Sequence, residues 1–398
     1  MTRSAADAGG RAIRALAVTL AIQAFTSLAA TATSVLAPEI APAAGFSPRL
    51  IGVFVGLVYA GSMLGSLFSG GFIERYGAIR VSQIGALACA AGVALVCGPI
   101  WALALAPMVI GLGYGTITPA SSHLLARTAP PNRMALTFSI KQTGVPLGAA
   151  LAGATLPALA LAFGWRSSLF LIALAGIGIV LIAQSTRKSL DIELARHRRV
   201  SLSAAFAPLK LIARDPRLTE LALVGFFYAA TQVCLMSYLV VYLAETLKAS
   251  LVTAGFALTI ANVGGIVGRI AWGAVADRRI PPRRMLALLG LTAGACSIAT
   301  ATFNQGWPPF ALMMVCAIFG ATAIGWNGVQ LAEVARNAPE GQAGAVTGAS
   351  GFVTFAGVVM GPPVFAVMVA FTANYRMGFL LFGCTSLICG SWLLVRSR

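Results

Sequence analysis

Twelve apolar runs of roughly 20 residues each leave this chain few possible folds. Backbone amides and carbonyls find no water inside a bilayer, and an α-helix satisfies them within the segment itself. A helical span needs about 20 residues. We therefore predict an all-α membrane protein with twelve transmembrane helices, near residues 14–37, 50–73, 79–98, 101–126, 134–163, 167–185, 219–244, 252–276, 285–303, 309–332, 344–371 and 377–395.

The charge composition agrees with a membrane protein. Only 10% of the residues are charged, against about 25% in a soluble domain. A net charge of +17 would suggest nucleic-acid binding in a soluble protein. Here most of the 28 Lys and Arg residues fall in the segments on one side of the predicted spans, and cytoplasmic loops carry such an excess. We predict a multi-pass protein of a bacterial-type inner (plasma) membrane with both termini in the cytoplasm, and no nucleic-acid partner.

An internal repeat divides the chain into two halves. The stretch 61–80 has a second copy at 264–279, in which Gly268 corresponds to Gly65 and Gly273 to Gly70 at one offset. We predict two six-helix repeats, residues 1–184 and 219–398, joined by a basic cytoplasmic linker at 185–218 to which we assign no chemistry. Parallel repeats of this kind occur in transporters whose substrate binds between the repeats.

The repeated stretch resembles a known signature. Gly70, Glu74, Arg75, Gly77 and Arg80 resemble the loop G-x-x-x-D-R-x-G-x-x-R between helices 2 and 3 of the major facilitator superfamily, with Glu in place of Asp. The resemblance extends over essentially the whole chain and implies the major facilitator fold, in which this loop acts as a conformational latch.

The second copy matches fewer positions of the signature. It keeps Gly273, Asp277 and Arg278 but has Ile280 where the first copy has Gly77. The resemblance implies gating roles for these three residues, as it does for the five residues of the first copy.

Two cations are predicted to lie inside the membrane. Lys141 follows Arg133 by eight residues and Arg269 precedes Asp277 by eight, so each lies about 12 Å into a slab roughly 30 Å thick. A charge in hydrocarbon costs about 2.5–3.5 kcal/mol on insertion scales, and no acid is near either cation in sequence within the spans. An anionic substrate would supply a partner. Two alternatives stay open: Lys141 can extend toward the headgroups, and Arg269 can pair with Asp277.

The resemblance sharpens the prediction for these cations. In the oxalate-transporter and monocarboxylate-transporter branches, a helix 8 arginine four residues before the loop glycine meets the substrate carboxylate, and Arg269 has that spacing from Gly273. We predict that Arg269 and Lys141 bind the charge of the substrate. Polar and aromatic residues of the spans are predicted to complete the substrate site: Gln23, Tyr59, Tyr228, Gln232, Asn262, Trp326 and Asn327.

These features lead to one functional expectation and several alternatives. We expect a secondary active transporter that moves a small organic anion, a mono- or dicarboxylate, by alternating access. The runner-up is a proton-driven exporter of drugs or neutral solutes, and a sensor on the same fold stays open. No cluster of His, Cys or acids has metal or nucleophile spacing, so we expect no cofactor and no enzyme activity. The expected partners are a small-molecule substrate and the lipid bilayer, and we expect a monomer.

Overall fold

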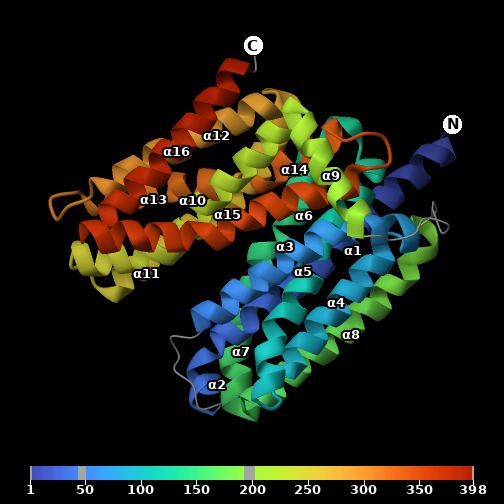
Figure 1. The fold of residues 1–398 in the computed structure, drawn as a ribbon, viewed down its shortest axis with the longest axis horizontal. Coiled ribbons are helices and arrows are strands. Elements are labelled where there is room, and N and C mark those ends of the chain that lie inside the picture. Colours follow the sequence, from blue (N-terminus) through green and yellow to red (C-terminus); the bar gives the residue numbers. More distant parts are fainter. Residues whose placement is uncertain (1, 44–50, 192–201, 397–398) are drawn as a thin grey trace. The chain divides into compact units, whose positions relative to one another are not determined.

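The structure of the protein is a computed structural model, in which residues 2–43, 51–191 and 202–396 are described (Figure 1). Every element in these ranges is a helix. The first repeat and linker hold α1 (Thr2–Val35), α2 (Ala37–Ala43), α3 (Ile51–Tyr76), α4 (Ala78–Leu95), α5 (Ile100–Thr128), η2 (Pro131–Arg133), α6 (Met134–Gln142), α7 (Gly144–Phe163), α8 (Trp165–Leu190) and α9 (Leu202–Arg214). The second repeat holds α10 (Pro216–Thr246), α11 (Leu251–Arg278), α12 (Pro282–Ala301), α13 (Pro309–Ala323), α14 (Asn327–Asn337), α15 (Ala343–Thr372) and α16 (Tyr375–Arg396).

The described helices provide 12 segments long and apolar enough to cross a membrane, which confirms the predicted fold class. Two of these segments are interrupted. The segment Pro131–Phe163 contains α6 and α7, which separate at Thr143. The segment Pro309–Asn337 contains α13 and α14, which are separated by a turn at residues 324–326. Both interruptions lie beside residues that the sequence proposes for the site.

The helices group into two compact units, which are described separately. Unit 1 holds the described parts of residues 1–131, 141–218 and 334–352, and unit 2 those of 132–140, 219–333 and 353–398. Each unit therefore takes one short segment from the other repeat. The first turns of α15 belong to unit 1, and most of α6 belongs to unit 2.

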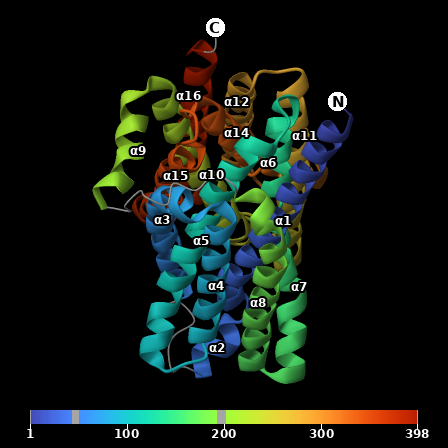
Figure 2. The ribbon, with the colours of Figure 1, turned by 90° about the vertical axis from the view of Figure 1, so that its right-hand side faces the viewer.

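In unit 1 the repeated glycines bring two helices into close contact. A Cβ atom on Gly61 of α3 would lie 2.8 Å from the Met108 carbonyl oxygen of α5, and Gly65 packs in the same way against Leu112. Small residues at four-residue spacing let helix backbones approach closely. On its other side α5 packs against α4, which also lies beside α8 (Figure 2).

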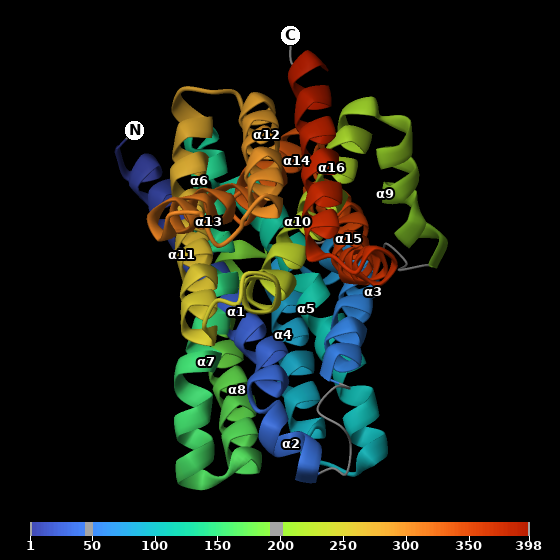
Figure 3. The same cartoon turned by 90° about the vertical axis from the view of Figure 1, so that its left-hand side faces the viewer.

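Unit 2 repeats this packing. Gly264 and Gly268 of α11 contact the backbone of α13 at Ala317 and Ala321, as Gly61 and Gly65 contact α5. Beside this pair, α12 packs along α16 (Figure 3). The repeat seen in the sequence thus recurs as a repeated pair of glycine-lined helix contacts.

Aromatic residues fill part of the core of unit 2. The ring of Tyr238 on α10 stacks on Phe365 of α15 with centroids 4.1 Å apart, and Phe365 meets Phe379 of α16 edge to face at 5.2 Å. Phe365 and Phe379 are almost completely buried. These rings join α10, α15 and α16.

Candidate functional site

Lys141 is buried among polar groups of unit 1. Its side chain is 1% exposed, and Nζ donates hydrogen bonds to Oε1 of Gln23 at 2.6 Å and Oε1 of Gln142 at 3.0 Å. A longer bond of 3.4 Å reaches Oγ1 of Thr118. Lys141 and Gln23, both proposed from the sequence, are therefore in direct contact. These three partners are neutral oxygens, which solvate an ammonium without cancelling its charge.

The junction of α6 and α7 places Lys141 beside α1. A Cβ on Gly144 would lie 2.9 Å from the Cβ of Gln23, so α7 begins directly against α1. Ser27 on α1 donates its hydroxyl to the Val145 carbonyl at 2.7 Å. This hydrogen bond attaches the first turn of α7 to α1.

Arg269 lies in unit 2 and contacts the second interrupted segment. Its side chain is 1% exposed, and Nε donates to the Ile324 carbonyl in the turn between α13 and α14 at 3.1 Å. One helical turn further along α11, Nε1 of Trp272 donates to the Ala321 carbonyl at 2.7 Å. Two side chains of α11 thus satisfy carbonyl groups at the interruption, and the bond from Nε fixes the plane of the Arg269 guanidinium.

Three more predicted residues meet next to the same turn. Oε1 of Gln232 accepts hydrogen bonds from Nε1 of Trp326 at 3.2 Å and from Nδ2 of Asn327 at 3.1 Å. Trp326 is 1% exposed and meets Tyr228 edge to face, with ring centroids 5.7 Å apart. The cluster joins α10 to the turn that also receives Arg269.

The remaining predicted residues have less distinctive surroundings. The Tyr228 hydroxyl donates to the Leu286 carbonyl of α12 at 3.0 Å, so it ties two helices together. Asn262 donates to Leu258 of its own helix at 3.0 Å, and Tyr59 lies half-buried on α3.

The first signature loop lies within unit 1. A Cβ on Gly70 would come 2.7 Å from the Cβ of Ala345 on α15, so α3 and α15 touch there. Nearby, Ser66 on α3 donates to the Gly348 carbonyl at 2.9 Å. Glu74 and Arg75 occupy the last turn of α3, and the Arg75 guanidinium lies over the Tyr76 ring at 5.3 Å.

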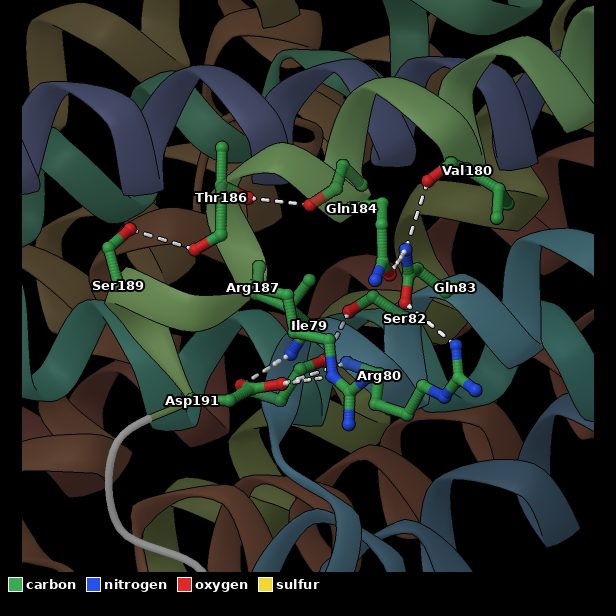
Figure 4. Close-up of polar contacts among 12 residues, drawn as sticks. Ile79, Arg80, Ser82, Gln83, Val180, Gln184, Thr186, Arg187, Ser189 and Asp191 are labelled. Carbon is green, nitrogen blue, oxygen red and sulfur yellow. Dashed lines mark hydrogen bonds and ion pairs between the residues drawn. The ribbon is translucent and has the colours of Figure 1, made fainter.

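Gly77 and Arg80 of this loop meet an acid at the end of α8. The Asp191 carboxylate accepts hydrogen bonds from the backbone N–H groups of Ile79 at 2.9 Å and Arg80 at 3.1 Å, and it thereby caps the N-terminus of α4 (Figure 4). Gly77 has φ +92°, a region that side chains disfavour, and its Cα lies against this carboxylate. Only a glycine suits both conditions at this position.

The surroundings of Asp191 affect its titration. Burial raises the pKa of the Asp191 carboxyl above its ordinary value, while the N–H groups of Ile79 and Arg80 and the charge of Arg187 act in the opposite direction. Gln83 on α4 extends the contact with α8, because its Nε2 donates to the Val180 carbonyl at 2.9 Å and to Gln184 at 3.0 Å (Figure 4). The loop is thus attached to α8.

The second signature loop lies within unit 2 and has its own capping contact. Asp277 accepts hydrogen bonds from the N–H groups of Ala135 at 3.0 Å and Leu136 at 2.7 Å, at the start of α6. A Cβ on Gly273 would lie 2.7 Å from the Cβ of Ser139. Arg278, the last residue of α11, is exposed. The second copy therefore packs against α6 although Ile280 replaces its glycine.

Sequence reasoning missed several residues that the structure adds. Thr118 and Gln142 belong to the Lys141 cluster, and Trp272 supports the interrupted segment beside Arg269. Polar residues within apolar spans were a usable signal for the first two. Asp191 gave little signal, because it falls in the basic linker at 185–218 to which we assigned no chemistry.

Comparison with known proteins identifies the family of this arrangement. Residues 19–362 match the family model described as Major Facilitator Superfamily. A gentisate transporter of Corynebacterium glutamicum is 24% identical over 374 residues, which cover 88% of this chain and 80% of that protein.

Two solved structures have the same fold. The E. coli fucose:proton symporter has a TM-score of 0.76 at 17% identity, with 97% of this chain and 99% of that one covered. The human organic anion transporter MFSD10 has a TM-score of 0.75 at 18% identity, with coverage of 96% and 99%. With twelve spans, a repeated signature loop and a family match over most of its length, this multi-pass membrane protein belongs to the major facilitator superfamily and is a secondary transporter, not an enzyme.

Proposed function

We propose that this transporter carries a small organic anion, a mono- or dicarboxylate, and that Arg269 and Lys141 bind its charge. The observation that carries the proposal is the burial of both cations, each 1% exposed, within segments that cross the membrane. A buried charge is costly unless it is paired. The contacts described above end on neutral oxygens, and the acids of the chain lie near the ends of the spans. An anionic substrate would bring a negative charge to these two buried cations.

The two cations suit different parts of a carboxylate site. A guanidinium has five N–H donors, and the bond from Nε of Arg269 to Ile324 leaves a planar group oriented for a bidentate grip. The Lys141 ammonium acts as a point charge whose position Gln23 and Gln142 hold. The polar cluster of Gln232, Trp326 and Asn327 adds hydrogen-bonding groups beside the turn that contacts Arg269.

Relatives support the anionic class. The gentisate transporter carries an organic anion by its name and aligns with most of this chain. The similarity to the fucose:proton symporter and to MFSD10 supports the fold only, because both are less than 25% identical to this chain.

The repeated loops support transport by alternating access, in which the six-helix halves 1–184 and 219–398 rock about the site. In each unit a segment from one half packs on a helix of the other: α15 on α3 beside Gly70, and α6 on α11 beside Gly273. We infer that these two contacts form and break together during the cycle, with Glu74, Arg75 and Asp277 as gating residues. The positive-inside rule orients these contacts and both termini toward the cytoplasm of the inner membrane. The transporter functions as a monomer in this proposal.

A ligand screen on the purified transporter tests the anion assignment. A ligand that binds only the folded state raises the melting temperature by mass action. We expect gentisate or succinate to stabilise the wild type and ethidium to have no effect. Arg269→Ala should weaken carboxylate binding about 10- to 100-fold, since a hydrogen bond to a charged group contributes about 1.5–3 kcal/mol. Lys141→Ala should weaken it about tenfold.

Matched variants separate binding from general damage. Lys248→Ala removes an exposed lysine of the same charge and should leave carboxylate binding unchanged. Arg269→Lys keeps the charge without the planar fork and should give an intermediate loss. Stabilisation by ethidium that persists in all variants would overturn the anion proposal in favour of a cation or drug exporter.

A further inference from the structure

Ser139 on α6 lies where this helix packs against two helices of unit 2, α11 and α14. Its side chain is fully buried, at 0% exposure. A Cβ atom added to Gly273 of α11 or to Gly328 of α14 would collide with the Ser139 hydroxyl. The hydroxyl oxygen therefore faces the Cα atoms of two glycines and is shut off from water.

The hydroxyl of Ser139 is also unpaired. Its oxygen, Oγ, has no hydrogen-bond partner within residues 2–43, 51–191 and 202–396. The facing glycines offer only Cα–H groups, which are weak donors. A buried hydroxyl without a partner loses its bonds to water and gains none, so it raises the free energy of the packed state. Natural structures keep few such groups, and this one calls for an explanation.

The other signature loop makes the corresponding contact with a paired serine. In each case the second span of one repeat meets the fifth span of the other: α3 meets α15 beside Gly70, and α11 meets α6 beside Gly273. At the first contact Ser66 donates its hydroxyl to the Gly348 carbonyl across the two helices. At the second contact Ser139 makes no such bond. Equivalent contacts thus hold one serine that stabilises the packing and one that opposes it.

We propose that Ser139 is a positioning residue of the transport cycle, whose unpaired hydroxyl makes the contact of α6 with α11 and α14 easier to open. This role rests on the proposed function, in which the two contacts open together in each cycle. When α6 separates, water can bind the hydroxyl, so the separated state gains a hydrogen bond that the packed state lacks. The populations of the packed and separated states follow their free-energy difference. The same change from serine to alanine should therefore tighten the contact at Ser139 and loosen it at Ser66.

Hydrogen exchange, measured by mass spectrometry on the full-length transporter without substrate, tests this role. The N–H groups of Ala135 and Leu136 at the start of α6 donate to the Asp277 carboxylate of α11, so they exchange when this contact opens. Ser139→Ala should slow exchange in α6 at least about fivefold, because it removes the unpaired hydroxyl. Ser66→Ala should speed this exchange about 2- to 10-fold, because it removes one hydrogen bond from the contact that opens in concert.

Ser297→Ala is the matched control. Ser297 on α12 is also a buried serine of unit 2, at 1% exposure, but its hydroxyl donates to the Phe379 carbonyl of α16 at 2.7 Å. Its replacement should lower the melting temperature and leave exchange in α6 unchanged. Ser139→Ala should not lower the melting temperature, since it breaks no hydrogen bond made by the described residues.

Three results would overturn the role of Ser139. Faster exchange in α6, or a lower melting temperature, in Ser139→Ala would mean that the hydroxyl stabilises the packed state. Unchanged exchange in Ser139→Ala beside a clear increase in Ser66→Ala would mean that the contacts open without help from this hydroxyl. Unchanged exchange in both variants would count against the opening of these contacts, and so against the proposed alternating access as well. The measurement uses no substrate, so a failure of carboxylate binding would remove the anion assignment and leave the role of Ser139 standing.

Discussion

At the scale of single residues, Gly77 shows why the signature loop needs its glycine. Its φ of +92° and ψ of 156° lie in a region essentially restricted to glycine. The Asp191 carboxylate also packs against its Cα. Gly77→Ala should therefore combine a backbone cost of about 1–3 kcal/mol with displacement of the cap on α4. Thermal unfolding of the purified protein measures the combined loss of stability.

A second glycine provides the control for this prediction. Gly164, before α8, has φ +80° and ψ 154°, and no described atom lies within 4 Å of the position of its Cβ. Gly164→Ala should therefore lower the free energy of unfolding only by the backbone cost of about 1–3 kcal/mol. In an Asp191→Ala background the two glycine variants should become similar. If Gly77→Ala and Gly164→Ala lose equal stability in the wild-type background, the contact with Asp191 contributes nothing to the loop.

At the scale of helices, the interruption between α13 and α14 depends on side chains from α11. The indole of Trp272 donates to the Ala321 carbonyl, which lies in the last turn of α13, where helix carbonyls have no partner N–H further along the helix. Trp272→Phe keeps most of the aromatic packing and removes the donor, so it should lower the free energy of unfolding by about 1–3 kcal/mol.

Trp392→Phe is the matched substitution for this test. Trp392 on α16 is half-buried, and its described contact is the Arg396 guanidinium over its ring at 5.4 Å. The stability of this variant should change by less than that of Trp272→Phe in the same thermal unfolding experiment. Equal effects of the two substitutions would show that the loss comes from ring size and not from the carbonyl at Ala321.

The helices were predictable from the sequence, and their interruptions were not. Hydropathy is averaged over about 20 residues. A turn of three residues at 324–326 hardly changes this average. We therefore predicted one continuous span over 309–332. The repeated glycines, in contrast, carry information about packing. Gly65 and Gly268 allow the helix axes to lie close together. A Cβ atom at either position would collide with a backbone carbonyl oxygen of the neighbouring helix.

Contacts between segments far apart in the chain could not be predicted from the sequence either. Lys141 was recognisable by its depth, but its bond to Gln23 depends on the packing of α7 against α1. Asp191 looked like one acid in a basic linker, because nothing local indicates that α8 ends beside the start of α4. Depth and residue type are local properties that a sequence records, whereas the pairing of helix ends is a property of the packed unit.

At the scale of the whole molecule, the charge bias predicts an orientation that labelling can measure. The linker helix α9 and the segment between α10 and α11 lie on opposite sides of one span, Pro216–Thr246. Lys210 and Lys248 are exposed representatives of the two segments. The positive-inside rule places Lys210 in the cytoplasm and Lys248 outside.

Single cysteines at these two positions decide the orientation. Cys97 lies outside the spans, so the labelling is done in a Cys97→Ser background; the other six cysteines lie within spans. A membrane-impermeant maleimide should label Lys248→Cys on intact cells and Lys210→Cys only after the membrane is permeabilised. The reverse pattern would place both termini outside.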